Sequence, residues 1–117
     1  MKCAITVFSA AIVLTLASGQ VFANGNIARG KQKATTCFAC HGADGNAADP
    51  QYPRLAGQYN EYLQQALHEY KDGRRKNPIM MGMAATLTDQ DIEDVAAYFS
   101  SLPSKLDTLQ GHIQGDK

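Results

Sequence analysis

Apolar residues recur at helical spacing in three stretches of the chain, and no stretch alternates between apolar and polar residues as a half-buried strand would. The clearest stretch places apolar side chains three and four positions apart, which forms one stripe along a helix. Its members are Tyr59, Tyr62, Leu63, Ala66, Leu67 and Tyr70. Gly73 follows and can end this helix in the left-handed conformation.

The last of the three stretches opens with a capping signal. Thr88 and Asp91 have the spacing of a capping box in its acidic variant. The apolar stripe behind this cap consists of Ile92, Val95, Ala96, Phe99 and Leu102. Pro103 cannot continue a helix, so the helix is expected to end just before it.

The first stretch predicts a helix that starts near Asn24 or Asn26, because either side chain can cap it. One face of this helix carries Ile27, Gly30, Lys31, Ala34 and Phe38. Glycine costs a helix about 1 kcal/mol relative to alanine. Gly30 therefore predicts that another helix crosses close to the backbone at this position.

Two loops separate the predicted helices. Residues 42–57 are rich in Gly, Ala, Asp and Pro, and packing against a cofactor would explain so long an irregular segment. Residues 74–83 are expected to form a second loop, basic at first and then rich in methionine. The pattern as a whole predicts an all-α fold.

Residues 1–23 have the order of a secretory signal peptide. Lys2 gives a positive start, an apolar run follows, and Val21 and Ala23 occupy the positions that a signal peptidase reads. The run is too short for a membrane span, which takes about 20 residues. We expect cleavage after Ala23, a mature domain of residues 24–117 without a membrane span, and a periplasmic location. An uncleaved anchor is the alternative.

Charge excludes one class of partner. The full chain has 11 basic and 11 acidic residues, and removal of the signal takes only Lys2 from this balance. Proteins that bind nucleic acids usually have a basic excess, so none is expected as a partner. Lys71, Arg74, Arg75 and Lys76 form a local basic run. This run is either a solvated helix end or a docking patch for an acidic redox partner.

The most specific motif is Cys37-Phe38-Ala39-Cys40-His41. Two cysteines three positions apart near a helix end place both sulfurs on one side, where they match the two vinyl groups of a haem. The next residue, His41, can then bind the iron, and this pattern is a known c-type haem attachment site. A disulfide, a thioredoxin-like redox pair and a zinc site are the alternatives. A thioredoxin-like redox pair would need a βαβ context, which the predicted helices do not provide. A zinc site would need a second cysteine pair, which the sequence lacks.

A second axial ligand is expected from a methionine, because electron carriers commonly hold haem iron between His and Met. Met80, Met81 and Met83 are the candidates, and flexible core filling explains those that are not ligands. His68 and His112 are alternative ligands, and an iron with an open position is a further alternative.

The chain resembles the class I bacterial cytochromes c, in particular the small kind found alone, as half of a dihaem cytochrome or as the haem subunit of a flavocytochrome. The resemblance covers essentially all of residues 24–117. Four stretches carry it: Cys37-Phe38-Ala39-Cys40-His41-Gly42, Tyr52-Pro53-Arg54-Leu55-Ala56-Gly57-Gln58, Met80-Met81-Gly82-Met83, and Leu87-Thr88-Asp89-Gln90-Asp91-Ile92 with Ala96-Ala97-Tyr98-Phe99. It implies the class I cytochrome c fold, three main helices plus loops wrapped around one covalent haem.

The resemblance also implies roles for single residues. The family's ligand methionine precedes a Leu-Ser/Thr-Asp sequence in the register of Met83, and Met80 is the second choice. Pro53 matches the proline whose carbonyl accepts a hydrogen bond from the ligand histidine. Gly30 and Tyr98 match the place where the first and last helices cross. Gly82 departs from the family, since many relatives have proline there, and exchange of ligand methionines becomes easier.

These features predict an electron carrier without enzyme activity of its own, exchanging electrons with a donor and an acceptor protein. A flavoprotein and a terminal oxidase are candidate partners. One alternative is the haem subunit of a larger oxidoreductase, such as a flavocytochrome c that oxidises sulfide. Another is a haem sensor or enzyme with a labile methionine ligand.

Overall fold

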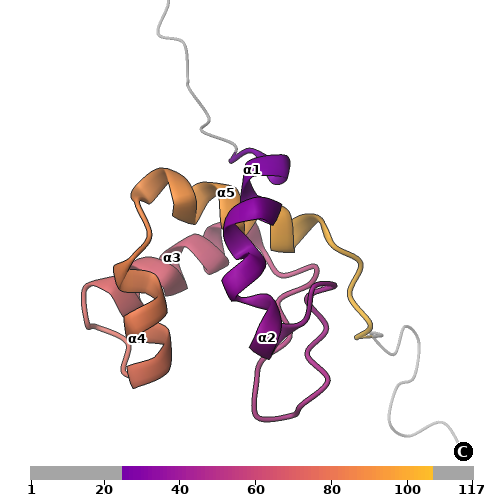
Figure 1. Ribbon diagram of the computed structural model, residues 1–117, viewed down its shortest axis with the longest axis horizontal. Helices are drawn as coiled ribbons and strands as arrows, with labels where there is room; N and C mark the ends of the chain where they lie inside the picture. The colour runs from indigo at the N-terminus through magenta and orange to yellow at the C-terminus, as the bar shows by residue number, and fades with distance from the viewer. Residues whose placement is uncertain (1–24, 107–117) are drawn as a thin grey trace, which may run out of the picture.

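Five α-helices and one short 3₁₀ helix make up residues 25–106, the part of the chain that this computed structural model describes (Figure 1). Their bounds are α1 Ile27–Lys33, η1 Ala34–Thr36, α2 Phe38–His41, α3 Asn60–Lys71, α4 Pro78–Ala85 and α5 Asp89–Ser101. None of these residues forms a strand, which confirms the all-α prediction. No helix within the same range is long and apolar enough to cross a bilayer. The predicted signal peptide lies outside these residues.

Helices α1 and α5 cross in close contact. Asn26 caps α1 by accepting a hydrogen bond from the Arg29 amide at 2.9 Å, as predicted. A Cβ atom on Gly30 would lie 1.9 Å from the Asp94 carbonyl oxygen and 2.9 Å from the Tyr98 Cβ atom. The prediction of a close crossing at Gly30 is therefore confirmed.

A polar network centred on the buried Asp94 carboxylate holds this crossing together. The Asp94 carboxylate accepts hydrogen bonds from the Asn26 amide at 2.6 Å and from the Arg29 Nε and Nη2 atoms at 2.6 and 2.9 Å. Asp94 is only 3% exposed. Hydrogen bonding to Arg29, more than any other cause, lowers the pKa of the Asp94 carboxyl below its usual value. The sequence pattern did not indicate this network.

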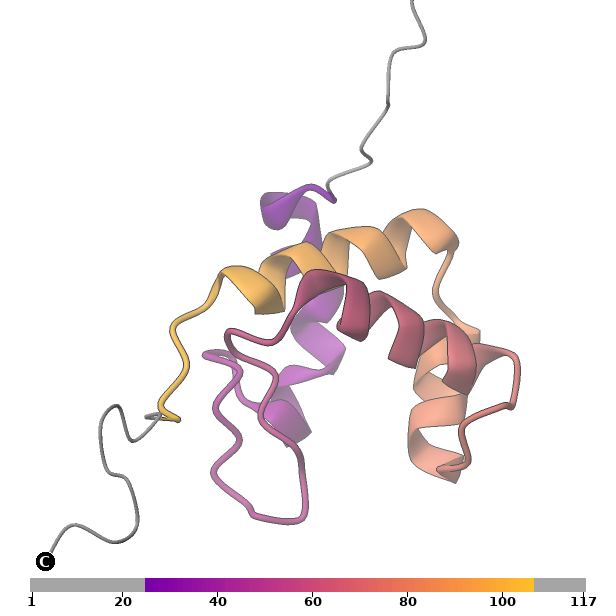
Figure 2. The ribbon, with the colours of Figure 1, turned by 180° about the vertical axis from the view of Figure 1, so that it is seen from behind.

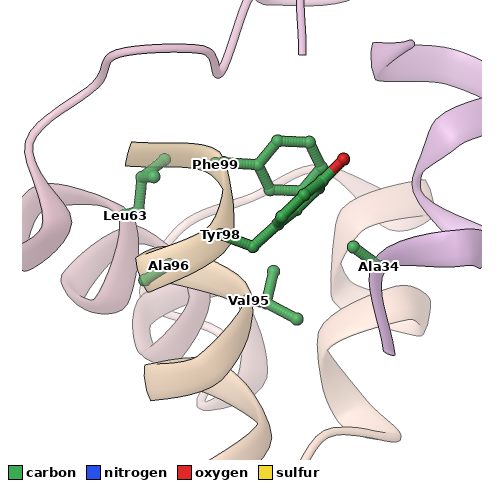
Figure 3. Packing of buried hydrophobic residues seen from close by; sticks show 6 residues of the cluster. All are labelled: Ala34, Leu63, Val95, Ala96, Tyr98 and Phe99. Atoms are coloured by element: carbon green, nitrogen blue, oxygen red, sulfur yellow. The ribbon is translucent and has the colours of Figure 1, made fainter. Parts of the chain in front are cut away.

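The apolar core forms where α5 meets η1 and α3 (Figure 3). Its buried members are Ala34, Leu63, Val95, Ala96, Tyr98 and Phe99. The rings of Tyr98 and Phe99 lie 5.1 Å apart, and Phe38 of α2 packs against both. The Tyr98 hydroxyl donates a hydrogen bond of 2.7 Å to the Ala43 carbonyl, which fixes the start of the following loop to α5.

The predicted termini of α5 are confirmed. Thr88 accepts from the Asp91 amide while the Asp91 carboxylate accepts from the Thr88 amide, so the capping box is complete. The helix ends at Ser101, and Leu102 is extended, as the residue before a proline usually is. Gly73, two residues after the end of α3, has a φ of 79° as expected.

The first predicted helix is interrupted. The chain changes from α1 to the 3₁₀ turn η1 at Ala34 and forms the short helix α2 only at Phe38. Thr35 donates its hydroxyl to the Gln32 carbonyl at 3.0 Å, and threonine is a poor residue for a helix interior. Of the residues assigned to one face of this helix, Gly30 and Ala34 are buried, whereas Ile27 is exposed.

The prediction of a loop over residues 74–83 is wrong for its second half, where α4 forms. Asn77 caps this helix by accepting from the amides of Ile79 and Met80, both at 3.1 Å. Pro78 occupies the first turn, where its missing N–H is not needed. The Asn-Pro pair was the signal for a helix start, and the run of methionines obscured it.

Candidate functional site

A cavity of about 470 Å³ lies among the helices, within the usual range for small-molecule sites of roughly 300–1,000 Å³. Figures 1 and 2 show α2 with the loop after it on one side of the fold and α4 on the other, with α3 and α5 across the top. All of these elements contribute to the lining. The residues used below are Cys37, Cys40, His41, Tyr52, Pro53, Tyr62, Leu63, Ala66, Leu67, Tyr70, Arg75, Asn77, Ile79, Met80 and Met83.

His41, the last residue of α2, lines the cavity and is 6% exposed. Its Nδ1 atom lies 2.8 Å from the carbonyl oxygen of Pro53. A carbonyl can only accept, so Nδ1 carries the proton and donates. This bond fixes the tautomer and the ring orientation and leaves the Nε2 lone pair for a metal.

The loop over residues 42–59 positions the Pro53 carbonyl. Gly45, with a φ of 68°, accepts hydrogen bonds from the amides of Leu55 and Ala56 at 2.8 and 3.0 Å, which closes the loop into an irregular hairpin. The ring of Tyr52 lies 6.2 Å from the ring of His41, nearly edge to face. The prediction of an irregular segment that packs around a site agrees with this arrangement.

Asn46 is a buried residue that the sequence analysis missed. Its Nδ2 atom donates to the Pro103 carbonyl at 3.1 Å, and its Oδ1 atom accepts from the Lys105 amide at 2.8 Å. The loop is therefore joined to the chain that follows α5. An Asn in a Gly- and Asp-rich loop has no pattern that would distinguish this role from an ordinary turn.

Cys37 and Cys40 lie one helical turn apart and both line the cavity beside His41. Both are half-buried free thiols. Burial raises the pKa of the Cys37 thiol above its usual value. The structure thus brings the three residues of the predicted attachment motif together at one wall.

Met80 and Met83 line the cavity from α4, whereas Met81 is not among the lining residues. Residues three apart share one face of a helix, which explains why these two point the same way. His68 is also absent from the lining, and its Nδ1 atom lies 4.0 Å from the Asp89 carboxylate. His112 lies outside the described residues.

The apolar stripe of α3 has a double role. Leu63 is buried in the core, while Ala66, Leu67 and Tyr70 are half-buried and line the cavity. Tyr62 also lines the cavity and is 46% exposed. The amphipathic pattern was predicted correctly, and much of the face that it marks borders the cavity as well as the core.

The basic run at residues 71–76 is partly neutralised. Lys71 lies 3.3 Å from the Asp89 carboxylate, and Arg74 lies 2.7 Å from the Asp72 carboxylate. Arg75 turns toward Tyr70, with its guanidinium 5.0 Å from the ring centre. The structure thus favours a solvated helix end over a strong docking patch.

Comparison with known proteins gives consistent matches over this region. The family model for cytochrome c matches residues 27–103. Cytochrome c4 of Pseudomonas aeruginosa is 48% identical over 91 residues, which cover 77% of this chain and 45% of that protein. Cytochrome c-554(548) of Halomonas halodenitrificans is 48% identical over 80 residues, covering 66% of this chain and 96% of that protein.

Solved structures agree with the sequence matches. Reduced cytochrome c4 from Pseudomonas stutzeri superposes with a TM-score of 0.67 and 43% identity, over 70% of this chain and 48% of that one. The chain therefore spans about half the length of the cytochrome c4 relatives that it matches. A thiosulfate dehydrogenase electron acceptor of Thiomonas intermedia is 37% identical over 92 residues, covering 73% of this chain and 42% of that protein.

Proposed function

Because this chain belongs to the cytochrome c family, as a class I c-type cytochrome whose cofactor is haem c with its iron, we propose that it is a periplasmic electron-transfer protein. We further propose that it binds one haem. The family model covers a single segment, residues 27–103, and the motif Cys37-Phe38-Ala39-Cys40-His41 occurs once in the sequence.

Cys37 and Cys40 are the proposed attachment points. Each thiol would add across one vinyl group to form a thioether, with the thiol hydrogen ending on the former vinyl carbon. The single helical turn that separates the two cysteines supports this assignment, because both residues line the same cavity.

His41 and Met83 are the proposed axial ligands. The single observation that carries the proposal is the hydrogen bond from His41 Nδ1 to the Pro53 carbonyl at 2.8 Å. This bond leaves the Nε2 nitrogen of a buried imidazole free, and His41 lines the same cavity as Met80 and Met83 of α4. Met83 is preferred over Met80 because its register before Leu87 and Thr88 is that of the family's ligand.

When bound, the haem supplies the redox chemistry, with iron that changes between the ferrous and ferric states. His41 and Met83 would hold the iron in both states and so keep its surroundings nearly constant. Two side-chain ligands would leave no open position for a substrate, and the apolar side chains of α3 and α5 that line the cavity would exclude water from the haem. Both features favour a carrier over an enzyme.

Export to the periplasm is proposed from residues 1–23, which have the order of a signal peptide with cleavage after Ala23. The domain would then comprise residues 24–117. Export agrees with the Cys-x-x-Cys-His motif, because haems of this kind are usually attached outside the cytoplasm.

Redox proteins are the proposed partners, a donor on one side and an acceptor on the other. The similarity to a thiosulfate dehydrogenase electron acceptor supports a second candidate function, in which the chain serves as the haem subunit of a larger oxidoreductase. Size-exclusion chromatography of the native extract separates the two. Migration at the size of the free chain supports a diffusible carrier, and co-migration with a dehydrogenase or flavoprotein supports the subunit.

Optical spectroscopy of the purified protein tests the carrier proposal. Reversible reduction and oxidation with a haem c spectrum, a far-red band of methionine-bound ferric iron and no carbon monoxide binding at neutral pH are expected. Ready binding of carbon monoxide by the reduced protein would contradict it and favour a sensor or an enzyme with a labile methionine.

A further inference from the structure

Helix α4, which carries the two methionines that line the cavity, is weakly anchored to the rest of the fold. It has eight residues, of which Ala84 near the C-terminal end is the buried one, while Ile79 in the first turn is 62% exposed. Just beyond Ala84, the Thr86 hydroxyl donates to the Met83 carbonyl at 2.9 Å. Helices this short are marginal in water on their own. The helical form of the first turn therefore depends on how that turn is capped.

Asn77 provides this cap from its side chain. Its Oδ1 atom accepts from the amides of Ile79 and Met80, both at 3.1 Å. Pro78 at the first position has no amide hydrogen. One oxygen atom of Asn77 thus satisfies both amide hydrogens that the start of α4 presents, and Asn77 itself lines the cavity.

The cap bears on Met83 through the helix backbone. In an α-helix each amide bonds to the carbonyl four residues earlier, so the amide of Met83 depends on Ile79 being helical. If the first turn frays, Met83 loses this hydrogen bond and keeps only the restraints at its C-terminal side. The first turn also contains Met80, the other methionine on the cavity-lining face.

We propose that Asn77 is a positioning residue for the iron–methionine bond: its cap holds the first turn of α4 in helical form while Met83 binds the iron, and the cap is lost when that bond opens. The inference rests on the proposed function, in which Met83 is the ligand. The cap and the bond are then linked, because whatever stabilises the helical first turn also stabilises the methionine-bound state.

The test uses imidazole, which binds ferric iron only after the methionine has left. Its dissociation constant is measured by loss of the far-red band in purified haem-containing wild type, Asn77→Ala, Asn77→Ser, Asn77→Gln and Asn26→Ala. Asn26 is the matched control, because its side chain caps α1 by accepting from the Arg29 amide and no residue of α1 lines the cavity. Denaturant titration of the same proteins gives the free energy of unfolding.

Asn77→Ala should strengthen imidazole binding by roughly two- to thirtyfold, the range that corresponds to loss of an N-cap. Asn77→Ser should bind imidazole as wild type does, because a serine hydroxyl caps a helix about as well. Asn77→Gln should resemble Asn77→Ala, since glutamine keeps the amide group but is not a preferred cap. Asn26→Ala should lower the free energy of unfolding and leave imidazole binding unchanged.

Equal imidazole binding by wild type and Asn77→Ala would overturn the inference, because the cap would then stabilise only the fold, as Asn26 does. Wild-type binding in Asn77→Gln, with Asn77→Ser resembling Asn77→Ala, would also overturn it, since the amide group and not the cap would then matter.

If Asn77→Ala is not recovered with haem, hydrogen exchange of the wild type decides. The amides of Ile79 and Met80 should lose protection when imidazole displaces the methionine, and those of α5 should keep theirs. Unchanged protection of the two α4 amides would overturn the inference. A wild type without covalent haem, or without the far-red band before imidazole is added, would contradict the proposed function itself, so the two failures are distinguishable.

Discussion

Gly30 of α1 packs directly on the backbone of Asp94 in α5, so that a Cβ atom on Gly30 would lie 1.9 Å from the Asp94 carbonyl oxygen. Backbone cannot move aside as a flexible side chain can. The two helices would have to separate, and the core around Val95 and Tyr98 would open with them. The crossing thus sets the frame on which the cavity is built.

Gly30→Ala should therefore lower the free energy of unfolding by at least about 2 kcal/mol, as overpacking of a tight contact does. Gly82→Ala is the control, because a Cβ atom there has nothing within 4 Å. Gly82 is exposed in α4, so its replacement should be neutral or stabilise by about 0.5–1 kcal/mol. Denaturant titration of the haem-containing proteins measures both. Equal effects of the two changes would contradict the close crossing.

Asp94 should make the stability depend on pH. Its pKa is lowered in the folded protein, chiefly by hydrogen bonding to Arg29, so folding favours the ionised form. The contribution is complete above the unfolded value of about 3.9 and is lost as pH falls through the lower, folded value. Asp94→Asn should cost about 1.5–3 kcal/mol at neutral pH.

The difference in free energy of unfolding between wild type and Asp94→Asn should shrink as the pH is lowered through the acid range. Glu61→Gln is the control, since Glu61 is exposed and has no salt bridge within residues 25–106. It should have little effect at any pH. A penalty for Asp94→Asn that stays constant down to pH values below the folded pKa would argue against a charged Asp94 at the crossing.

Met83→Ala should lower the midpoint potential and open the iron to exogenous ligands, because the thioether ligand that raises the potential is lost. Met80→Ala and Met81→Ala should keep the far-red band of methionine-bound ferric iron. Absorbance and cyanide titration of the three variants decide the assignment. Retention of the band in Met83→Ala with loss in the Met80→Ala, Met83→Ala double variant would identify Met80, which shares the cavity-lining face of α4, as a replacement ligand.

The chain without haem should be largely unfolded. Ala66, Leu67 and Tyr70 of the α3 stripe line the cavity and are only half-buried, so part of their apolar surface would be covered only when haem fills it. Small domains commonly need a cofactor, a metal or a disulfide to stabilise a core of limited size, and here the covalent haem would do so. Far-ultraviolet circular dichroism of a Cys37→Ser, Cys40→Ser variant should show most helicity lost. Cys3→Ser, which changes a cysteine in the predicted signal, should leave the mature protein unaffected, and native-like helicity without haem would refute the prediction.

Much of the fold could be predicted from local sequence rules. The caps at Asn26 and Thr88 and the termination at Gly73 follow from side chains close in sequence, and the structure confirms each of them. Helix α4 was not predicted because only the short Asn77-Pro78 pair marks its start. Its apolar residues are also spread around the helix and show no stripe.

At the site, only residues close together in the sequence could be predicted. The attachment motif occupies five consecutive residues, so its side chains are close in any helical conformation. The network around Asp94 and the anchoring of Asn46 join residues 57 or more positions apart, and no short pattern reports such pairs. Likewise, the sequence places Arg75 in a basic run, and only the fold separates it from Arg74.

The mass of the exported protein tests the central claim most directly. If haem is joined through Cys37 and Cys40, the intact mass should equal residues 24–117 plus one haem, and it should survive denaturation and acid extraction. A mass equal to that of the processed polypeptide alone would contradict the account.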